Sequence, residues 1–377
     1  MTAPEYLDQP APVTASGTTS VVVGVDTHQQ THHAAVLTGT GTLIATREFP
    51  ASPAGYEQLW AWAREHADAA GMAGVATVGV ESTGSYGAGL AQFLLTTDPA
   101  VGWAAGVDVR EVIRPEKTVR AMRGKSDPID AEAAARAVLA GTATGRPKVK
   151  TGIVEAIRAL VVARDSAVKQ RTAAASQLRD LITTAPESIR GELLGLSTAR
   201  RVTRAVKYRP DTTNLSDPLQ AVKYALRALG RRIQALETEI AEADQALTPL
   251  VAAAAPRLLA LPQVGTNTAA QLLITGGQNI DRMRSEAAFA KLVGVAPLPA
   301  SSGKTTRHRL NRGGDRAANS ALYLLVCRRL ATDPATKAYM QRRSQDPRMG
   351  TPDIIRCLKR YAARQIYTAL RADLLTA

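Results

Sequence analysis

The sequence predicts an α/β domain at the N-terminus followed by a mostly α-helical remainder, and three observations carry this prediction. The first is a set of short apolar runs in the first 145 residues, which alternate with helical segments in the order βββαβαβα. The second is a change to long helical periodicity from Val154 onward, and the third is a heptad repeat in the middle of the chain. At 377 residues the chain exceeds what one compact core usually holds, which indicates two or three domains.

The elements of the first domain follow from their local patterns. A leader at residues 1–18, rich in Pro, Ala, Thr and Ser, is predicted to be disordered. Asp127 is expected to be the N-cap of the last helix because Pro128 suits its first turn. The predicted strands are 21–26, 33–37, 43–49, 75–81 and 103–108, and the predicted helices are 53–70, 88–97 and 128–140.

Apolar residues spaced alternately three and four apart run without a break through the middle of the chain. This pattern predicts a coiled coil, with Leu178, Leu181 and Ile182 of the preceding helix as an intramolecular partner. The alternatives are an internal amphipathic hairpin and association between copies. The domains are then 19–145 (α/β), 146–256 (helical coiled coil) and 257–377 (mostly α-helical). The heptad residues are Leu219, Val222, Leu226, Leu229, Ile233, Leu236, Ile240, Ala243, Leu247 and Leu250.

Charge is distributed unevenly along the chain. Lys and Arg number 47 against 33 Asp and Glu, a net charge of +14. Residues 1–145 carry −6, whereas 146–256 carry +7 and 257–377 carry +13. A polyanion is therefore the expected partner of the C-terminal two thirds, the alternative being a generally basic surface.

Other whole-chain features narrow the class of protein. No apolar run approaches the ~18 residues of a membrane helix, and the N-terminus lacks the basic start and apolar stretch of a signal peptide. Two cysteines, Cys327 and Cys357, provide neither a disulfide framework nor a four-ligand zinc site. We expect a cytoplasmic protein with no membrane partner.

Four carboxylates form the main candidate site. Asp26 and Glu81 end two strands expected to be neighbours, and Asp127 and Asp130 project from one face of a helix start. Carboxylates this close repel one another, and Mg²⁺, which prefers oxygen ligands, would neutralise them. A pair of such ions suits attack on a phosphodiester. Taken singly, each acid has an ordinary structural explanation, and Asp108, expected to end the fifth strand, is a rival ligand.

A second candidate site is a Ser/Gly-rich basic loop near the C-terminus. A serine here, Ser302 or its neighbour Ser301, could reach a phosphate whose charge nearby cations neutralise. The residues alone fit a phosphate-binding loop with no covalent role equally well. The cations are Lys304, Arg307, Arg309 and Arg312.

Three further features have weaker functional interpretations. The segment at 261–266 looks like the hairpin of a helix-hairpin-helix, or a simple turn between helices. His28, His32 and His33 are interpreted as strand and turn residues rather than metal ligands. A basic series near the C-terminus is expected to bind a nucleic-acid backbone: Arg342, Arg343, Arg348, Arg356, Lys359, Arg360 and Arg364.

Several short motifs follow one another along the chain. In the first domain they are VGVDTH at 23–28, VESTG at 80–84 and KSDPIDA at 125–131. In the C-terminal third they are LPQVG at 261–265, FAKLVGVAP at 289–297, SGK at 302–304 and RGGD at 312–315. Together these motifs resemble those of the DEDD family of insertion-sequence transposases. The chain departs from the family pattern at Gln29, where Lys is common, and at Gln263, where Gly is common.

The resemblance implies an N-terminal RNase H-like domain similar to the Holliday-junction resolvase RuvC, with Mg²⁺ held by Asp26, Glu81, Asp127 and Asp130. It implies that Ser302 attacks DNA and that a structured guide RNA pairs with donor and target DNA. It also implies a homo-oligomer, dimer or tetramer, acting at the bacterial nucleoid. The alternatives are a RuvC-like endonuclease that uses water, and a non-catalytic DNA-organising protein.

Overall fold

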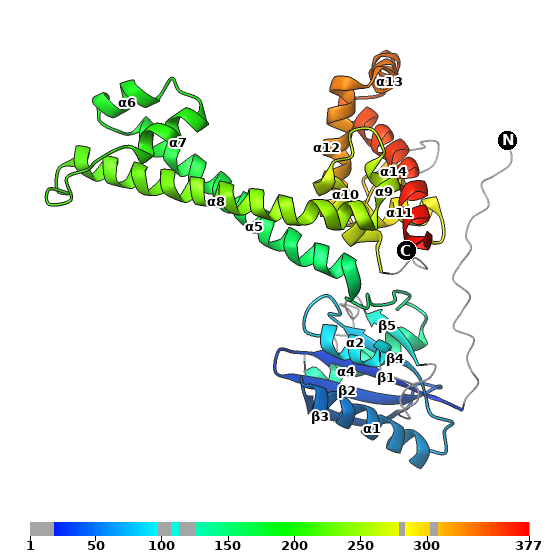
Figure 1. Ribbon diagram of the computed structural model, residues 1–377. Helices are drawn as coiled ribbons and strands as arrows, with labels where there is room; N and C mark the ends of the chain where they lie inside the picture. The colour runs from blue at the N-terminus through cyan, green and yellow to red at the C-terminus, as the bar shows by residue number, and fades with distance from the viewer. Residues whose placement is uncertain (1–18, 97–106, 113–125, 279–282, 302–307, 377) are drawn as a thin grey trace. The chain divides into compact units, whose positions relative to one another are not determined.

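The computed structural model describes residues 19–96, 107–112, 126–278, 283–301 and 308–376 (Figure 1). The chain forms two compact units, Met1–Lys150 and Thr151–Ala377, each with its own hydrophobic clusters. The predicted α/β N-terminal part and mostly helical remainder are confirmed. The finer division at residues 146 and 257 stays a prediction.

A five-stranded sheet in the order β3-β2-β1-β4-β5 forms the centre of the first unit. The hairpin strands β2 and β3 pair antiparallel with β1 and with each other, whereas β4 and β5 run parallel to β1. This is the topology expected of an RNase H-like domain. The strands are β1 (Val21–Thr27), β2 (Thr31–Thr38), β3 (Leu43–Pro50), β4 (Val75–Glu81) and β5 (Asp108–Val112).

Helices cover both faces of this sheet. Val21, Val23 and Val25 of β1 pack with α1 (Pro53–Ala69) and α2 (Ala88–Thr96), because alternate side chains of a strand point to the same face. On the opposite face, Val22 packs against the alanine-rich side of α4 (Asp127–Leu139). The alternation leaves Gly24 and Asp26 on the α4 face as well.

Gly24 allows α4 to lie directly on the sheet. A Cβ atom at this position would lie 2.2 Å from both the Ala131 carbonyl oxygen and the Ala135 backbone nitrogen. At Gly79 of the neighbouring strand, a Cβ atom would lie 2.6 Å from Val138. Asp127 and Asp130, at the start of the helix, lie near Asp26 at the end of β1, whereas Ala131 and Ala135 lie over Gly24, so the helix runs antiparallel to β1.

The prediction of the fifth strand was wrong in its position. The strand covers Asp108–Val112, and Asp108 begins it rather than ends it; residues 103–106 lie outside the described part of the chain. The side chains that enter the core are those of Val109 and Val112, beyond the apolar run on which the prediction rested. Because Asp108 pairs with Thr77 at the start of β4, it lies at the opposite end of the strands from Glu81. Asp108 instead forms ion pairs with Arg110 and Arg146 and is not a rival ligand.

The predicted N-cap of α4 was wrong by one residue. Ser126 has the extended backbone of a cap (φ −150°, ψ 153°), and its carbonyl accepts the first helical hydrogen bond, from Asp130 N at 3.0 Å. Asp127 is therefore the first helical residue. Its carboxylate is not needed as a cap and lies on the α4 side that faces the strand ends.

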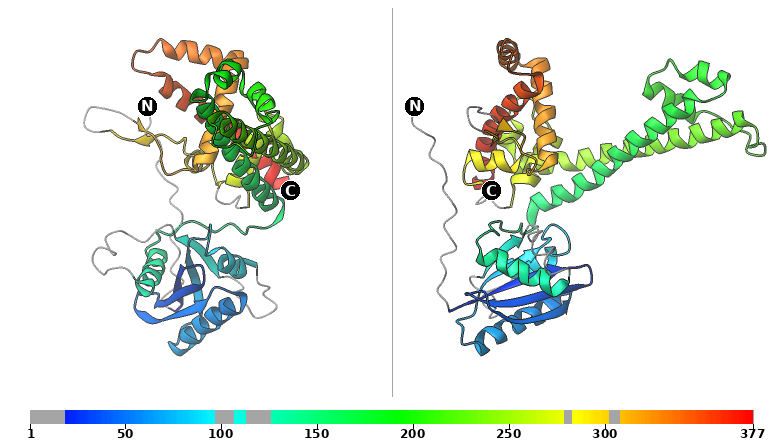
Figure 2. Two further views of the ribbon diagram at one scale, coloured as in Figure 1. Left: turned by 90° about the vertical axis from the view of Figure 1, so that its left-hand side faces the viewer. Right: turned by 180° about the vertical axis from the view of Figure 1, so that it is seen from behind.

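In the second unit, two long helices form an antiparallel arm, α5 (Gly152–Thr183) and α8 (Pro218–Ala254) (Figure 2). Arg164 pairs with Asp244 at 2.6 Å and Arg171 with Glu237 at 3.7 Å, which fixes the direction of the pairing. Leu226 and Ile233 of the heptad residues lie in one cluster with Leu178 and Ile182 of α5. Leu247 and Leu250, further along α8, pack in the larger cluster of the unit. Knobs-into-holes packing of a true coiled coil stays a prediction.

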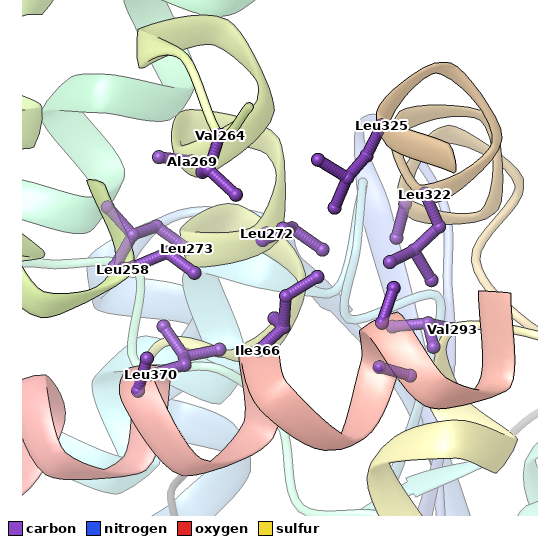
Figure 3. Close-up of a cluster of buried hydrophobic side chains, with 14 of the residues drawn as sticks. Leu258, Val264, Ala269, Leu272, Leu273, Val293, Leu322, Leu325, Ile366 and Leu370 are labelled. Atoms are coloured by element: carbon purple, nitrogen blue, oxygen red, sulfur yellow. The ribbon is translucent and has the colours of Figure 1, made fainter. Parts of the chain in front are cut away.

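The arm carries a small apolar cluster at its tip and begins at the largest hydrophobic cluster of the second unit, called the main core. Its tip carries α6 (Glu187–Leu193) and α7 (Thr198–Val206), whose Leu193 and Val202 are buried. The main core lies between α10, α12 and α14 (Figure 3). No helix in the described ranges is both long and apolar enough to cross a membrane. The elements around this core are α9 (Pro256–Leu259), α10 (Thr266–Gly276), α11 (Glu286–Leu292), β6 (Leu298–Pro299), β7 (His308–Arg309), α12 (Arg316–Thr332), α13 (Pro334–Ser344) and α14 (Thr351–Thr376).

The turn between α9 and α10 accounts for one departure from the family pattern. Gln263 has a φ of +65°, in the left-handed region that favours glycine. The buried guanidinium of Arg329 donates two hydrogen bonds to the carbonyl of Pro262, at 3.2 and 3.1 Å, and so holds the turn in place. The glycine common in the family thus matches a backbone conformation that this chain adopts without it.

Gly24→Ala should destabilise the first unit. The added methyl group meets backbone atoms of α4 that cannot move without shifting the helix, so we expect a loss of about 1–3 kcal/mol in the free energy of unfolding. Chemical denaturation of the full chain measures it. Gly84→Ala is the matched control, because a Cβ atom there has no neighbour within 4 Å. Equal stability of the two variants would contradict the close contact.

Candidate functional site

Asp26 and Glu81 lie side by side at the ends of two parallel strands. β1 and β4 pair in register at Val25 and Val80, so the next residue of each strand is an acid on the α4 face. The Thr27 hydroxyl donates a hydrogen bond to the Glu81 carbonyl at 3.1 Å and ties the two strand ends together. Asp26 and Glu81 are 7% and 8% exposed, so both carboxylates are largely withdrawn from water.

The start of α4 adds two carboxylates to this sheet edge. Asp130 is 2% exposed, whereas the Asp127 side chain is 44% exposed and marks the solvent side of the cluster. Both are close enough to Asp26 for their negative charges to raise the pKa of that carboxyl. The structure thus brings Asp26, Asp127 and Asp130 together around the end of β1, with Glu81 on the adjacent strand.

His28 joins this cluster, and the sequence interpretation missed it. Its Nε2 atom lies 3.4 Å from Asp26 Oδ2 and 3.7 Å from Asp127 Oδ1. Ligand atoms of Asp26, His28 and Asp127 all lie within 4.8 Å of one another. The available signal was the position of His28 in the short turn after β1, two residues beyond Asp26. The other two histidines do lie in β2, as predicted.

The surroundings of Asp26 disfavour its ionised form. Burial raises the pKa of Asp26 above its ordinary value, and the neighbouring charges of Asp130 and Asp127 raise it further. His28 and a backbone hydrogen bond at Thr27 act in the opposite direction but do not cancel the rise. A cation at this position would relieve the repulsion.

The residues present fit a divalent cation. Asp26 of β1, His28 in the turn after β1 and Asp127 of α4 bring possible ligand atoms together, and oxygen ligands of this kind suit Mg²⁺ or Mn²⁺. Asp130 lies close to Asp26, and Glu81 ends the adjacent strand.

The second candidate site is only partly covered by the described residues. Ser302, Lys304 and Arg307 lie outside them. Ser301 is exposed two residues after β6, and Arg309 and Arg312 are exposed in and after β7. The two short strands pair antiparallel, Leu298 with Arg309 and Pro299 with His308, so they form the base of the Ser/Gly-rich segment between them, residues 300–307, called the serine loop.

A strongly basic cleft of about 810 Å³ lies beside this base. Its lining includes Arg309 and most of the basic series predicted to bind a nucleic-acid backbone, against two acids, Asp346 and Asp353. The lining cations from that series are Arg343, Arg348, Arg356, Lys359, Arg360 and Arg364.

Lys359 connects the cleft to the segment that precedes β6. It is 7% exposed and donates a hydrogen bond to Asn319 Oδ1 at 2.8 Å. Asn319 in turn donates to the carbonyls of Val293 and Gly294, both at 3.0 Å, in the segment that leads to β6. Burial, and then the charge of Arg356, lower the pKa of Lys359.

Fold and site together define an RNase H-like domain with carboxylates at its strand ends, joined to a basic helical unit. Comparison with known families agrees with both parts. Residues 23–185 match the DEDD transposase model of IS110, described as a transposase, and residues 255–341 match the transposase IS116/IS110/IS902 family. The two matches cover about two thirds of the chain. The chain belongs to the IS110 family of DEDD transposases.

Two curated relatives are similar over part of their length. An uncharacterized 43.6 kDa protein of insertion element IS110 from Streptomyces coelicolor is 30% identical over 163 residues, which are 43% of this chain and 38% of the relative. An uncharacterized 42 kDa protein of insertion element IS900 from Mycobacterium paratuberculosis is 26% identical over 135 residues, 35% of this chain and 34% of the relative. The chain therefore matches little more than a third of the length of these relatives.

Asp26→Asn should change stability in opposite directions with and without metal. A raised pKa in the folded state means that Asp26 favours folding below its unfolded pKa, about 3.9, and loses that contribution as pH rises through the folded value. In EDTA, the variant should therefore unfold at a higher temperature than the wild type at pH 7, and the difference should vanish below about pH 4. With Mg²⁺ or Mn²⁺ the wild type should gain stability and the variant should not.

Thermal unfolding of the full chain in the two buffers measures both effects. Asp68→Asn, which removes an exposed acid of α1, is the control and should change neither. A variant less stable than the wild type in EDTA at pH 7 would show that the carboxylate of Asp26 is satisfied without a cation.

Proposed function

We propose that this protein is the transposase of an insertion sequence and that it cuts and joins DNA strands by phosphoryl transfer. The observation that carries the proposal is the convergence of Asp26, Glu81, Asp127 and Asp130 at one edge of an RNase H-like sheet. Membership of the IS110 family supports it.

In this proposal the carboxylate site would hold two divalent cations, both Mg²⁺. Bound there, the ions supply positive charge to the entering and leaving oxygens of the phosphodiester. The role of the protein itself is to position the four carboxylates. The β1–β4 pairing fixes Asp26 beside Glu81, and the Gly24 contact fixes Asp127 and Asp130 above them. Burial of Asp26, Glu81 and Asp130 keeps water away from one side of the site.

Ser302 is the nucleophile of the proposed reaction. Its hydroxyl loses a proton, its Oγ atom bonds to phosphorus, and a deoxyribose oxygen leaves and takes up a proton. The phosphoserine ester retains the energy of the broken phosphodiester, so a hydroxyl group of another strand can reverse the step without a high-energy cofactor. Lys304, Arg307, Arg309 and Arg312 would stabilise the charge that develops on the phosphate oxygens.

The basic cleft beside β6 and β7 is the proposed binding surface for the nucleic-acid backbone. Guanidinium groups pair with phosphates irrespective of base sequence, which suits donor and target DNA as well as a structured guide RNA. We also propose that the protein assembles as a dimer or tetramer and acts at the bacterial nucleoid. The two helices of the arm would form a coiled coil.

Ser302→Ala tests the nucleophile. We expect the variant to bind DNA and divalent cations as the wild type does but to form no protein-linked DNA after incubation with labelled substrate. Denaturing electrophoresis detects the adduct, and Ser301→Ala is the matched control, which should retain it. Wild-type cleavage by Ser302→Ala in Mg²⁺ would identify water as the nucleophile and favour a RuvC-like endonuclease. No cleavage by the wild type itself would favour a DNA-organising protein.

Arg309→Gln and Arg364→Gln test the cleft. Each removes one cation that lines it, so each should weaken DNA binding several-fold and reduce the slope of log affinity against log salt by about one. Fluorescence anisotropy at several salt concentrations measures both quantities. Arg231→Gln, which removes an exposed cation of α8, should leave the slope unchanged. An equal loss in all three variants would mean that the cleft is no more than part of a general basic surface.

A further inference from the structure

The imidazole of His28 lies in the metal site proposed above, beside the four carboxylates assigned to it. Its Nε2 atom lies 3.4 Å from one Asp26 oxygen and 3.7 Å from one Asp127 oxygen. Two atoms that each bind an octahedral ion at about 2.1 Å lie about 3.0 Å apart at right angles and about 4.2 Å apart across the ion. The observed separations fall between these limits, as expected of groups that share one ion.

The backbone presents this ring to the cluster. His28 follows the last residue of β1, and its N–H donates to the carbonyl of Thr31 at 2.9 Å, which closes the tight turn into β2. The side chain is 53% exposed, so an ion from solvent can reach it without a change in the core. No other histidine is part of a metal-ligand cluster among the residues that the structure describes.

We propose that His28 is a nitrogen ligand of the divalent cation bound by Asp26 and Asp127. This inference rests on the metal site of the proposed function and adds the chemistry of the ion. Mg²⁺ prefers oxygen ligands, whereas Mn²⁺ and later transition ions accept imidazole readily. A site with one imidazole among carboxylates therefore discriminates in favour of Mn²⁺.

A counter-ion role is the competing explanation for the position of His28. A protonated imidazole beside two carboxylates would form the ion pairs that the distances also allow, and an incoming metal ion would displace it. The two roles differ in a measurable way. A ligand is bonded to the ion and contributes to the binding of Mn²⁺ more than to that of Mg²⁺, whereas a displaced counter-ion affects both ions alike.

Pulsed electron paramagnetic resonance of the full chain loaded with Mn²⁺ alone tests the bond directly. The wild type should show hyperfine coupling to ¹⁴N, and His28→Gln should lose it. Loss of the nitrogen ligand should weaken Mn²⁺ binding about tenfold and Mg²⁺ binding by no more than about twofold. His28→Asp, which restores an oxygen ligand, should bind both ions without nitrogen coupling.

The chain offers matched controls because it has five histidines. His33 lies directly opposite Asp26 in the β1–β2 register and is the strongest rival ligand, and His308 lies in the other unit. His33→Gln and His308→Gln should both keep the nitrogen coupling.

Three results would overturn the inference while leaving the metal site in place. They are Mn²⁺ binding without nitrogen coupling in the wild type, coupling that persists in His28→Gln, and an equal loss of Mn²⁺ and Mg²⁺ affinity in that variant. Failure of the wild type to bind either ion more tightly than Asp26→Asn would overturn the metal site of the proposed function together with the ligand.

Discussion

The contact between α4 and the sheet at Gly24 is the constraint on which the carboxylate site depends. Four acids from three elements can meet only if the helix lies against the strands without intervening side chains. The same short pattern occurs in both strands: Gly24 stands two residues before Asp26, and Gly79 two residues before Glu81. Because side chains two residues apart share a face of the sheet, the glycine and the acid of each strand both lie on the α4 face. The glycine leaves room for the helix, and the acid lies further along the strand.

The start of α4 both packs on the sheet and carries two of the four acids. The N-terminus of α4 carries the positive end of the helix dipole, which favours the nearby negative charges. Burial, together with the charges of Asp130 and Asp127, raises the pKa of Asp26. A cation bound at this edge of the sheet would therefore offset the repulsion between the acids. The basic residues of the second unit gather in a cleft at the base of the serine loop.

The sequence predicted the order of elements in the first unit because alternation and glycine-rich turns are local properties. It also predicted that Asp26 and Glu81 would be neighbours, since parallel strands end at one edge. The start of β5 could not be read, because an apolar run precedes Asp108 and the strand boundary depends on pairing with β4. His28 was missed because only the three-dimensional turn after β1 brings its ring back towards Asp127. The intramolecular partner of the heptad seam was identified from Leu178 and Ile182, whose spacing matches that of α8.

The arm has a consequence for how members of such a family can differ in size. Its two helices leave and re-enter the same core, and its tip has a separate apolar cluster. At 1.5 Å per residue, the 32 residues of α5 extend for about 48 Å. Insertion or deletion of matching helical turns in α5 and α8 would change the reach of the tip while leaving both its packing and the core intact. The length of the arm can thus vary without a change in either apolar cluster.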